Sequence, residues 1–346
     1  MSSTHSYPIG AKWIYSIIRM DLKAKITATG GFVPTNRRTN NYLANITDTS
    51  NEWIIKRTGI KERRILADEL ATSDMIVPAI EDLMKNTDMS LQEIDCLIVA
   101  TCTPDMPMPS TANIVCRKLG LKNVFGFDIN SACTGFLYAI SLGASLIESR
   151  KYRNVIVAGA DKMSSVTDLQ DRRTNILFGD GAGAVLLQLS DDETGIQDSL
   201  LCGNGDGAEM LLIEGGGSLY PASMETLGSR KHFIRQDGRA VFRNAIEKMT
   251  AVSKALLDKN ALSIDNVDWL IPHQANMRII EAVGKELGID AGRVISNVQY
   301  YGNTTAATIP LCLWDYKDKF QKGDLLLLTA FGAGFTWGAT LLKWGM

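Results

Sequence analysis

The stretch Ile94–Ile98, with the sequence IDCLI, returns as VDWLI at Val267–Ile271. The interval is 268 − 95 = 173 residues, half of the 346-residue chain. Asn130–Thr134 (NSACT) recurs at the same interval as Asn303–Ala307 (NTTAA). A fixed interval shared by separate matches is the signature of an internal repeat. The sequence therefore predicts a duplicated fold with two similar halves.

The segments around these matches alternate between apolar strands and amphipathic helices. Near-continuous Val/Ile/Leu strands between helices are typical of sheets covered on both faces, which predicts an α/β protein. We expect strands at 23–29, 95–100, 124–129, 154–158, 183–187, 268–271, 325–330 and 338–342, and helices at 110–119, 134–149, 239–259, 277–287 and 305–317.

The expected organisation follows from the repeat. Residues 1–21 read as an extension, 22–190 as the first half, 191–238 as an irregular connection and 239–346 as the second half. No Pro/Ser-rich linker separates the halves, so we expect them to pack as one body.

Composition excludes several classes of protein. Lys and Arg number 36 against 38 Asp and Glu, so the net charge of −2 provides no general attraction to nucleic acid or anionic membranes. No run reaches eighteen apolar residues and no secretory signal is recognisable, so we expect no membrane span and a cytoplasmic location. The six cysteines form no CxxC pair and no zinc-ligand spacing with the three histidines, which predicts free thiols and no metal site.

Cys133 differs in setting from the other five cysteines. It follows an apolar strand and precedes a helix, where the helix dipole stabilises a thiolate. We therefore expect a lowered pKa and a nucleophilic role, against the alternative of a small core residue. The others are expected to be ordinary thiols.

His273 and Asn303 also follow expected strands, in IPHQAN and YGNTT. Catalytic groups of α/β sheets gather at such strand ends. His5 falls in the extension and His232 in a charged, solvated run. A helix cap is the alternative for Asn303. Under the duplication, however, Asn303 lies at the site symmetric to the Cys133 turn. The GDGAG at Gly179–Gly183 precedes a strand, so it does not fit a phosphate loop.

Six motifs together resemble the β-ketoacyl-acyl-carrier-protein synthase III group of the thiolase-like superfamily, over about residues 22–346. The motifs are Asp48–Ile54 with Arg57–Ile60, Ser131–Gly135, Phe178–Gly183, Pro272–Asn276, Gly302–Ala306 and Gly334–Gly338. The resemblance implies a thiolase-like duplicated fold, with the two halves forming a five-layered αβαβα core.

The resemblance also implies a condensing enzyme that initiates fatty-acid synthesis. Cys133 would take the acyl group from acyl-CoA, and malonyl-acyl carrier protein would then lose carbon dioxide and attack it. His273 and Asn303 would stabilise the enolate, and the backbone N–H groups of Cys133 and Ala333 would bind the acyl oxygen. The family often has glycine where this chain has Ala333, so the geometry there is open. No metal or redox cofactor is implied, since the coenzyme A thioester is a substrate.

Further positions carry over from the family. Trp53 and Arg172 would hold the adenine, with Arg173 replacing a residue that is often glycine. Arg278 and Lys285 would bind the acidic carrier protein, although a solvated helix face is an alternative for both. In a homodimer, Met108 would reach across the interface and form the floor of the partner's acyl pocket. The remaining matches to the CoA tunnel are Thr49, Arg57 and Asn276.

Four alternatives stay open at this stage. A thiolase would need a second cysteine within 332–335, and there is none. A related ketosynthase that starts a specialised metabolite would differ in its acyl site, which the irregular residues 203–237 could shape. A non-catalytic acyl-binding protein would lack one of Cys133, His273 and Asn303. A Cys/His hydrolase fits poorly with the asparagine and the CoA-site match.

Overall fold

Two mixed β-sheets form the framework of the computed structural model, which describes residues 22–346. The predicted extension at 1–21 lies outside the described residues. The first sheet has the order β1-β7-β6-β4-β5, in which β7 runs antiparallel to both of its neighbours and β6, β4 and β5 run parallel. Its strands are β1 (Ala24–Phe32), β4 (Cys96–Ala100), β5 (Phe125–Ile129), β6 (Val155–Lys162) and β7 (Asp180–Leu189).

The second sheet repeats this arrangement. Its order is β8-β13-β12-β11, with the same antiparallel and parallel pairings in the same places. An isolated parallel bridge from Val294 to Leu270 stands where the first sheet has β5. The predicted duplication is therefore present in the strand topology. The strands are β8 (Gly195–Gly203), β11 (Trp269–Pro272), β12 (Leu325–Gly332) and β13 (Thr336–Lys343).

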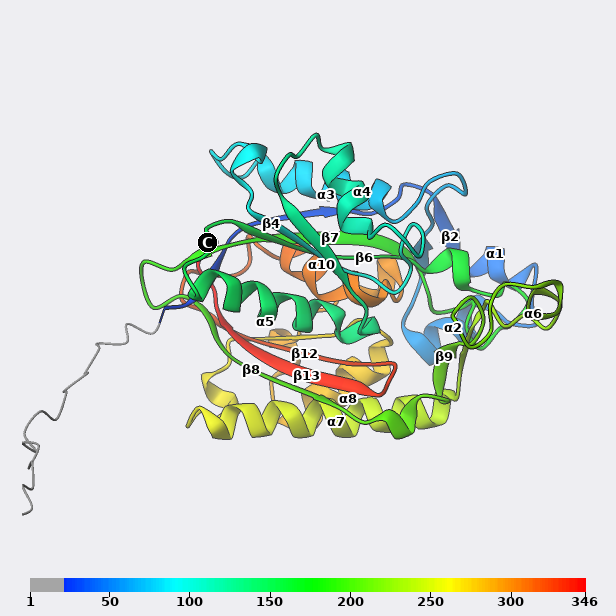
Figure 1. Ribbon diagram of the computed structural model, residues 1–346. Helices are drawn as coiled ribbons and strands as arrows, with labels where there is room; N and C mark the ends of the chain where they lie inside the picture. Colours follow the sequence, from blue (N-terminus) through cyan, green and yellow to red (C-terminus); the bar gives the residue numbers. More distant parts are fainter. Residues whose placement is uncertain (1–21) are drawn as a thin grey trace, which may run out of the picture.

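The helices complete five layers (Figure 1). The outer face of the first sheet is covered by α3 (Ser73–Met84) and α4 (Thr111–Lys118). Between the sheets lie α5 (Gly135–Glu148) and α10 (Thr308–Asp315), and the outer face of the second sheet carries α7 (Gly238–Lys259) and α8 (Met277–Leu287). Each helical layer has its own apolar core against a sheet. The predicted αβαβα architecture is confirmed.

The smaller elements lie in the connections. The short strands and helices are β2 (Arg37–Thr39), α1 (Asn40–Ala44), α2 (Asn51–Thr58), β3 (Glu62–Arg64), β9 (Leu211–Ile213), α6 (Met224–Gly228), β10 (Ile234–Gln236) and α9 (Val298–Tyr301). Single 3₁₀ turns occupy Leu91–Glu93, η2 (Ala132–Thr134), Met163–Val166, Gly205–Gly207, Ile264–Asn266, Ala291–Arg293 and η7 (Thr305–Ala307).

The segment expected to be irregular, 191–238, contains regular structure. It includes β8, which holds the same place in the second sheet as β1 holds in the first. It also includes the β9–β10 hairpin, with α6 between its strands. We propose that the second half begins with β8, so that only the hairpin segment is an insertion between repeated elements.

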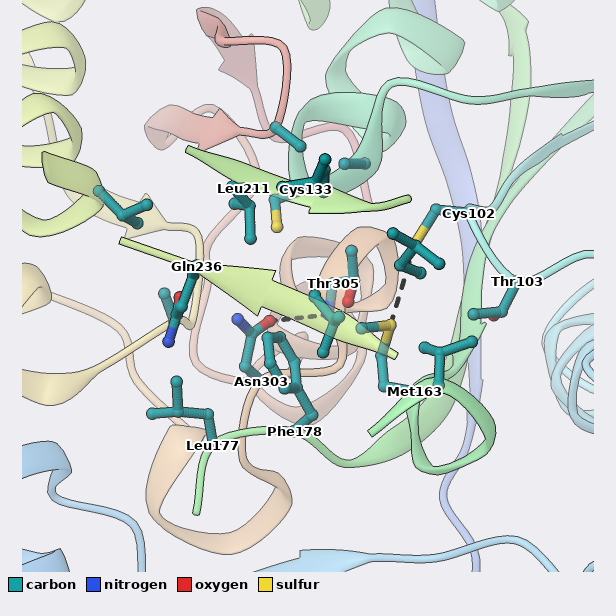
Figure 2. Close-up of a pocket in the computed structure, with 18 of the residues that line it drawn as sticks. Cys102, Thr103, Cys133, Met163, Leu177, Phe178, Leu211, Gln236, Asn303 and Thr305 are labelled. Carbon is teal, nitrogen blue, oxygen red and sulfur yellow. Dashed lines mark hydrogen bonds between the residues drawn. The ribbon is translucent and has the colours of Figure 1, made fainter. Parts of the chain in front are cut away.

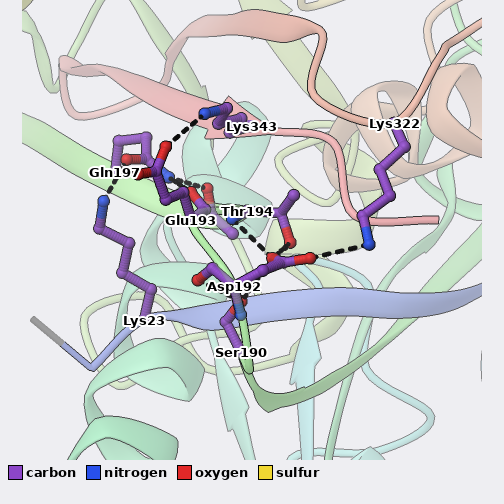
Figure 3. Close-up of polar contacts among 9 residues, drawn as sticks. Lys23, Ser190, Asp192, Glu193, Thr194, Gln197, Lys322 and Lys343 are labelled. Carbon is purple, nitrogen blue, oxygen red and sulfur yellow. Dashed lines mark hydrogen bonds and ion pairs between the residues drawn. The ribbon is translucent and has the colours of Figure 1, made fainter. Parts of the chain in front are cut away.

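A short polar turn joins β7 to β8 (Figure 3). Asp192 accepts a hydrogen bond from the Thr194 N–H (2.8 Å) and pairs with Lys322 (2.8 Å). The Lys322 ammonium is the main reason why the pKa of Asp192 lies below its usual range. Glu193 pairs with Lys343 of β13 (3.2 Å). Exposed pairs contribute little to stability, but these contacts tie the connection directly to the second half.

Two strained turns bring the halves together. Ala132 in η2 has φ 44° and Thr305 in η7 has φ 54°, and 132 + 173 = 305. Non-glycine residues rarely adopt such values. Each turn packs on a glycine of the other half: a Cβ on Gly159 would lie 2.2 Å from the Ala306 carbonyl oxygen, and one on Gly332 would lie 2.9 Å from the Cys133 nitrogen. This packing of each turn on the other half places the N-terminal ends of the central helices α5 and α10 side by side.

Candidate active site

A cavity of about 1190 Å³ lies where the two strained turns meet. Cys133 from the first half and His273 and Asn303 from the second all line it, as the sequence predicts. Figure 2 shows Cys133 on one wall and Asn303, bonded to Thr305, on another. Trp53, whose side chain is 36% exposed, and the exposed Arg57 mark its opening to solvent.

Cys133 is a buried, neutral thiol, and the expected lowering of its pKa is wrong. Burial raises the pKa of the Cys133 thiol, and the carboxylate of Asp161 raises it further. A thiolate in this cavity would lose its hydration, and that cost exceeds the stabilisation offered by the helix end. Attack by Cys133 must therefore be coupled to loss of its proton.

Asp161 is a buried carboxylate that sequence reasoning missed. It lies in β6 and accepts hydrogen bonds from the Cys102 N–H (2.8 Å), both polar groups of Thr103 (2.9 and 3.1 Å), the Thr101 hydroxyl (3.0 Å) and the Ala306 N–H (3.0 Å). It thus connects the Cys102 loop of the first half to η7 of the second. An aspartate directly after the apolar run VIVAGA was the available signal.

His273 extends the line of β11, and its N–H donates to the Thr329 carbonyl (2.8 Å). Its ring is buried, and burial lowers the pKa of His273 to about 3. The imidazole is therefore neutral at physiological pH. Nδ1 lies 2.7 Å from the Thr308 hydroxyl oxygen.

Asn303 is joined to the first half by a parallel bridge to Phe178. Its Oδ1 accepts the Thr305 N–H (2.9 Å), which forms an Asx turn directly before η7. The N-cap position of η7 is Thr304, so the alternative interpretation of Asn303 as the helix cap is wrong. The same bond directs the amide NH₂ group to the cavity, because the other end of the amide is occupied. The turn formed by Asn303 is therefore compatible with a role in the cavity.

Ala333 lines the cavity beside Gly332, whose close approach to Cys133 leaves no room for a side chain. The Ala333 carbonyl accepts the Thr336 hydroxyl (3.0 Å). Within residues 22–346, Ala333 is not among the non-glycine residues with positive φ. An alanine therefore fits the backbone that the family often builds with glycine.

Four of the five predicted CoA residues, all except Thr49, are linked by contacts at the opening. Two guanidinium groups lie near the Trp53 ring. The guanidinium carbon of Arg57 is 5.8 Å from the ring centroid, and that of Arg172 is 5.4 Å from it. Arg172 also donates to the Asp48 carbonyl (2.6 Å) and pairs with its carboxylate (3.1 Å). Asn276 donates to the Arg57 carbonyl (3.1 Å) and caps α8 by accepting the Arg278 N–H.

Not every predicted residue lines the cavity. Arg173 and Arg278 do, and Arg278 stacks over Phe242 (5.1 Å). Lys285 lies exposed near the end of α8 and the Met108 side chain is 84% exposed. The predicted residues outside the lining are Thr49, Met108, Arg172 and Lys285.

Other lining residues were not predicted. His232, expected in a solvated run, is half-buried at the cavity wall, with Nε2 3.0 Å from the Thr226 hydroxyl. It lies next to β10. The apolar residues of the β9–β10 hairpin, Leu211–Ile213 and Ile234, were the sequence signal that this segment forms a buried wall. Cys102 also faces the cavity, with its sulfur 3.9 Å from that of Met163.

The described part of the chain lacks two kinds of feature. No helix within residues 22–346 is both long and apolar enough to cross a membrane. In the same range, no group of three or more His, Cys, Asp or Glu side chains is placed to hold a metal ion.

Comparison with known proteins agrees with this geometry. Two family models match, 3-oxoacyl-(acyl-carrier-protein) synthase III at residues 127–205 and its C-terminal model at residues 257–344. Beta-ketoacyl-(acyl-carrier-protein) synthase III 2 of Bacteroides thetaiotaomicron is 47% identical over 325 residues, which is 94% of this chain and 97% of that protein. The chain belongs to the 3-oxoacyl-acyl-carrier-protein synthase III family.

Other members of the synthase III family are similarly close. Beta-ketoacyl-(acyl-carrier-protein) synthase III of Phocaeicola vulgatus is 49% identical, again over 94% of this chain and 97% of that one. The crystal structure of 3-oxoacyl-(acyl-carrier-protein) synthase III from Aquifex aeolicus matches with a TM-score of 0.86 and 41% identity, over 93% of this chain and all of that one. The expected thiolase-like fold of the synthase III family is confirmed.

One structural neighbour bears on the alternative function. The priming β-ketosynthase of the R1128 polyketide biosynthetic pathway matches with a TM-score of 0.86 at 29% identity, over 93% of this chain and 96% of that one. Its backbone is as similar as that of the Aquifex enzyme, so fold alone does not separate the two roles.

Proposed function

We propose that this acyltransferase starts fatty-acid synthesis by condensing an acyl group from acyl-CoA with malonyl-acyl carrier protein. The observation that carries the proposal is the convergence of Cys133, His273 and Asn303, from both halves, on one cavity. Membership of the synthase III family supports the same reaction.

In the first half-reaction, the Cys133 sulfur attacks the thioester carbonyl. The sulfur–acyl bond forms, the bond to the CoA sulfur breaks, and the Cys133 proton leaves with CoA as its thiol. The raised pKa of Cys133 indicates that the thiol is the resting form, so its proton must leave in the course of the attack. The oxyanion formed on the way would be bound by the backbone N–H groups of Cys133 and Ala333.

In the second half-reaction, the malonyl carboxylate leaves as carbon dioxide and its bonding electrons form an enolate. The His273 ring and the Asn303 amide donate hydrogen bonds to the enolate oxygen. The enolate carbon then attacks the acyl-cysteine, and the released Cys133 thiolate takes up a proton. Donors that are fixed in advance stabilise the developing charge more than the ground state.

The opening supports a CoA site that must widen on binding. A planar base in contact with both Trp53 and Arg172 needs about 7 Å between them, twice the usual contact distance. The observed separation is 5.4 Å. The Arg172 guanidinium would therefore move aside when adenine enters, and its present contacts with Asp48 would lengthen.

Partner proteins are part of the proposal. The exposed Met108 and the edge strand β5, whose Phe125 is 39% exposed, support a homodimer formed along this edge. Arg278 lies at the cavity and is a candidate contact for the acidic carrier protein, with Lys285 further along α8. The free thiols of all six cysteines support the expected cytoplasmic location.

A ketosynthase that primes a specialised metabolite is the second candidate. The polyketide-priming neighbour and the β9–β10 hairpin in the cavity wall favour keeping it. A panel of acetyl, branched and longer acyl-CoAs, each with the fatty-acid carrier protein, separates the two roles. The fatty-acid role requires turnover with that carrier protein.

The central experiment follows each half-reaction. The protein is incubated with labelled acyl-CoA alone and then with malonyl-acyl carrier protein. We expect label on Cys133 first, and release of carbon dioxide only after the second substrate. Absence of label on the wild type, or equal labelling of Cys133→Ala, would refute the mechanism.

A further inference from the structure

A single hydroxyl, that of Thr308, lies between two possible acceptors. Thr308 is the first residue of α10 and is buried. Its Oγ1 is 2.7 Å from Nδ1 of His273 and 3.0 Å from the carbonyl oxygen of Thr305. A hydroxyl carries one proton, so it can donate to only one of them.

The distances favour the imidazole as the acceptor. Hydrogen bonds donated by a hydroxyl are most often about 2.7–2.8 Å long, which is the length of the contact to Nδ1, whereas the contact to Thr305 lies at the long end of the range. The Thr305 carbonyl already accepts the backbone N–H of Thr308. Without the hydroxyl, Nδ1 would have no partner within residues 22–346.

The proton of the neutral ring must then be on Nε2. A buried imidazole without charge carries one proton, and a nitrogen that accepts a hydrogen bond cannot also hold it. Nδ1 makes the only side-chain hydrogen bond of His273 in the described chain. Nε2 is therefore the nitrogen left to the cavity, with its proton available.

We propose that Thr308 is a positioning residue that holds His273 as the Nε2–H tautomer and thereby makes it a hydrogen-bond donor to the substrate. This inference rests on the proposed function, because the donor matters only if a negative oxygen forms in the cavity. The opposite tautomer would point a lone pair at that oxygen and repel it.

The same turn orients the second donor. The Thr305 N–H holds Oδ1 of Asn303, and this leaves the amide NH₂ group facing the cavity. One strained turn, residues 303–308, thus determines the polarity of both groups. Figure 2 shows the bond between Asn303 and Thr305 at the cavity wall.

The direct test is the protonation state of the His273 ring. The full-length chain contains only three histidines, so ¹⁵N-histidine labelling gives three ring spin systems. Two-bond ¹H–¹⁵N spectra tell a protonated ring nitrogen from a bare one, and His232→Gln and His5→Gln assign the other two. We expect His273 to carry its proton on Nε2 in the wild type and in Thr308→Ser. A proton on Nδ1 would overturn the proposal.

The second test separates the two half-reactions. Thr308→Val removes the hydroxyl at nearly constant shape, and Thr340→Val is the matched control. Thr340 is equally buried, and its hydroxyl bonds to Ser199 (3.0 Å) outside the cavity lining. We expect Thr308→Val to slow malonyl decarboxylation about 10- to 100-fold, the range typical for removing the partner that orients a metal-binding histidine. Acylation of Cys133 should change little, and Thr308→Ser should restore the rate.

Each outcome decides between the two levels of inference. Equal behaviour of Thr308→Val and Thr340→Val in both half-reactions would overturn the role of Thr308. If Thr308→Val does not fold, the wild-type spectrum and Thr308→Ser still decide the tautomer. Failure of the wild type to become acylated would refute the proposed function instead, since the ring spectrum does not depend on turnover.

Discussion

The two strained turns, η2 and η7, have similar backbone conformations but carry side chains of different chemistry. In the repeat, with its interval of 173 residues, Cys133 corresponds to Ala306, Ala132 to Thr305 and Gly135 to Thr308. Gly135 allows close packing, since a Cβ there would lie 3.2 Å from that of Ala100 and 3.6 Å from that of Ala306. Thr308 instead reaches His273. Duplication thus supplied two similar turns, of which one presents the nucleophile and the other orients the groups that assist it.

Removing the nucleophile tests whether the first turn alone attacks. We expect Cys133→Ala to lose condensation by at least about a thousandfold, as for other covalent nucleophiles. The readout is 3-oxoacyl product per minute, with Cys116→Ala, away from the cavity, as the control. Adding Ala306→Cys to Cys133→Ala places a thiol in the second turn, and we expect no recovery. Recovery would mean that the two turns are interchangeable.

Removing a donor tests the second turn. We expect Asn303→Ala to slow condensation about 10²- to 10³-fold, the typical cost of one oxyanion donor. Acylation of Cys133 should persist, because the donors proposed for that step are the backbone N–H groups of Cys133 and Ala333. Asn303→Asp keeps the shape but brings a carboxylate to the enolate, so it should be at least as slow. A loss of acylation equal to the loss of condensation would contradict this division.

The two interface glycines test the packing of each turn on the other half. Gly159→Ala and Gly332→Ala each insert a methyl group against the opposite turn, and overpacking of this kind typically costs about 1–3 kcal/mol. The closer approach at Gly159 (2.2 Å against 2.9 Å) predicts the larger loss in free energy of unfolding. Gly332→Ala should lose more activity relative to its stability, because it presses on Cys133. Urea unfolding and single-turnover acylation give both quantities.

Acid should destabilise the second turn through His273. The pKa of His273 is about 3 in the folded protein and about 6.5 when the chain is unfolded. Between these values the unfolded chain binds a proton that the folded chain does not, so stability falls as pH drops below 6.5. His273→Gln should therefore lose less stability than the wild type between pH 7 and pH 4. The same substitution at His232 is the control, and equal losses in all three proteins would contradict the assignment.

Much of the fold could be predicted from local sequence. The apolar strands at 96–100 and 269–272 and the helices that follow them have strong periodicity, and their structure agrees closely. The strand β8 was missed because its sequence, GIQDSLLCG, is only partly apolar and most of it is half-buried. Its place is determined by pairing with β13, which lies more than 130 residues later.

The site shows the same division. Cys133 and His273 were predictable because each follows a strand with a residue type suited to the chemistry. The strand expected before Asn303 is wrong, since the short helix α9 (Val298–Tyr301) precedes it; the repeat of the Cys133 segment identified this residue instead. Asp161, Cys102 and His232 were missed, because local signals are weak at these positions and their contacts are with neighbours distant in the sequence. The pKa of Cys133 was predicted in the wrong direction because a helix end is visible in sequence and burial is not.

The sequence by itself determined the duplication, the α/β class, the family and the three principal side chains of the site. These follow from residue types and spacings, which are local properties of the chain. The tertiary structure alone decided that the halves cross so closely that only glycine fits at 159 and 332. It also decided that the Cys133 thiol is neutral, and it positioned the hydroxyl of Thr308 against His273. Burial and hydrogen-bond partners depend on the meeting of segments far apart in the chain, and no local pattern encodes that meeting.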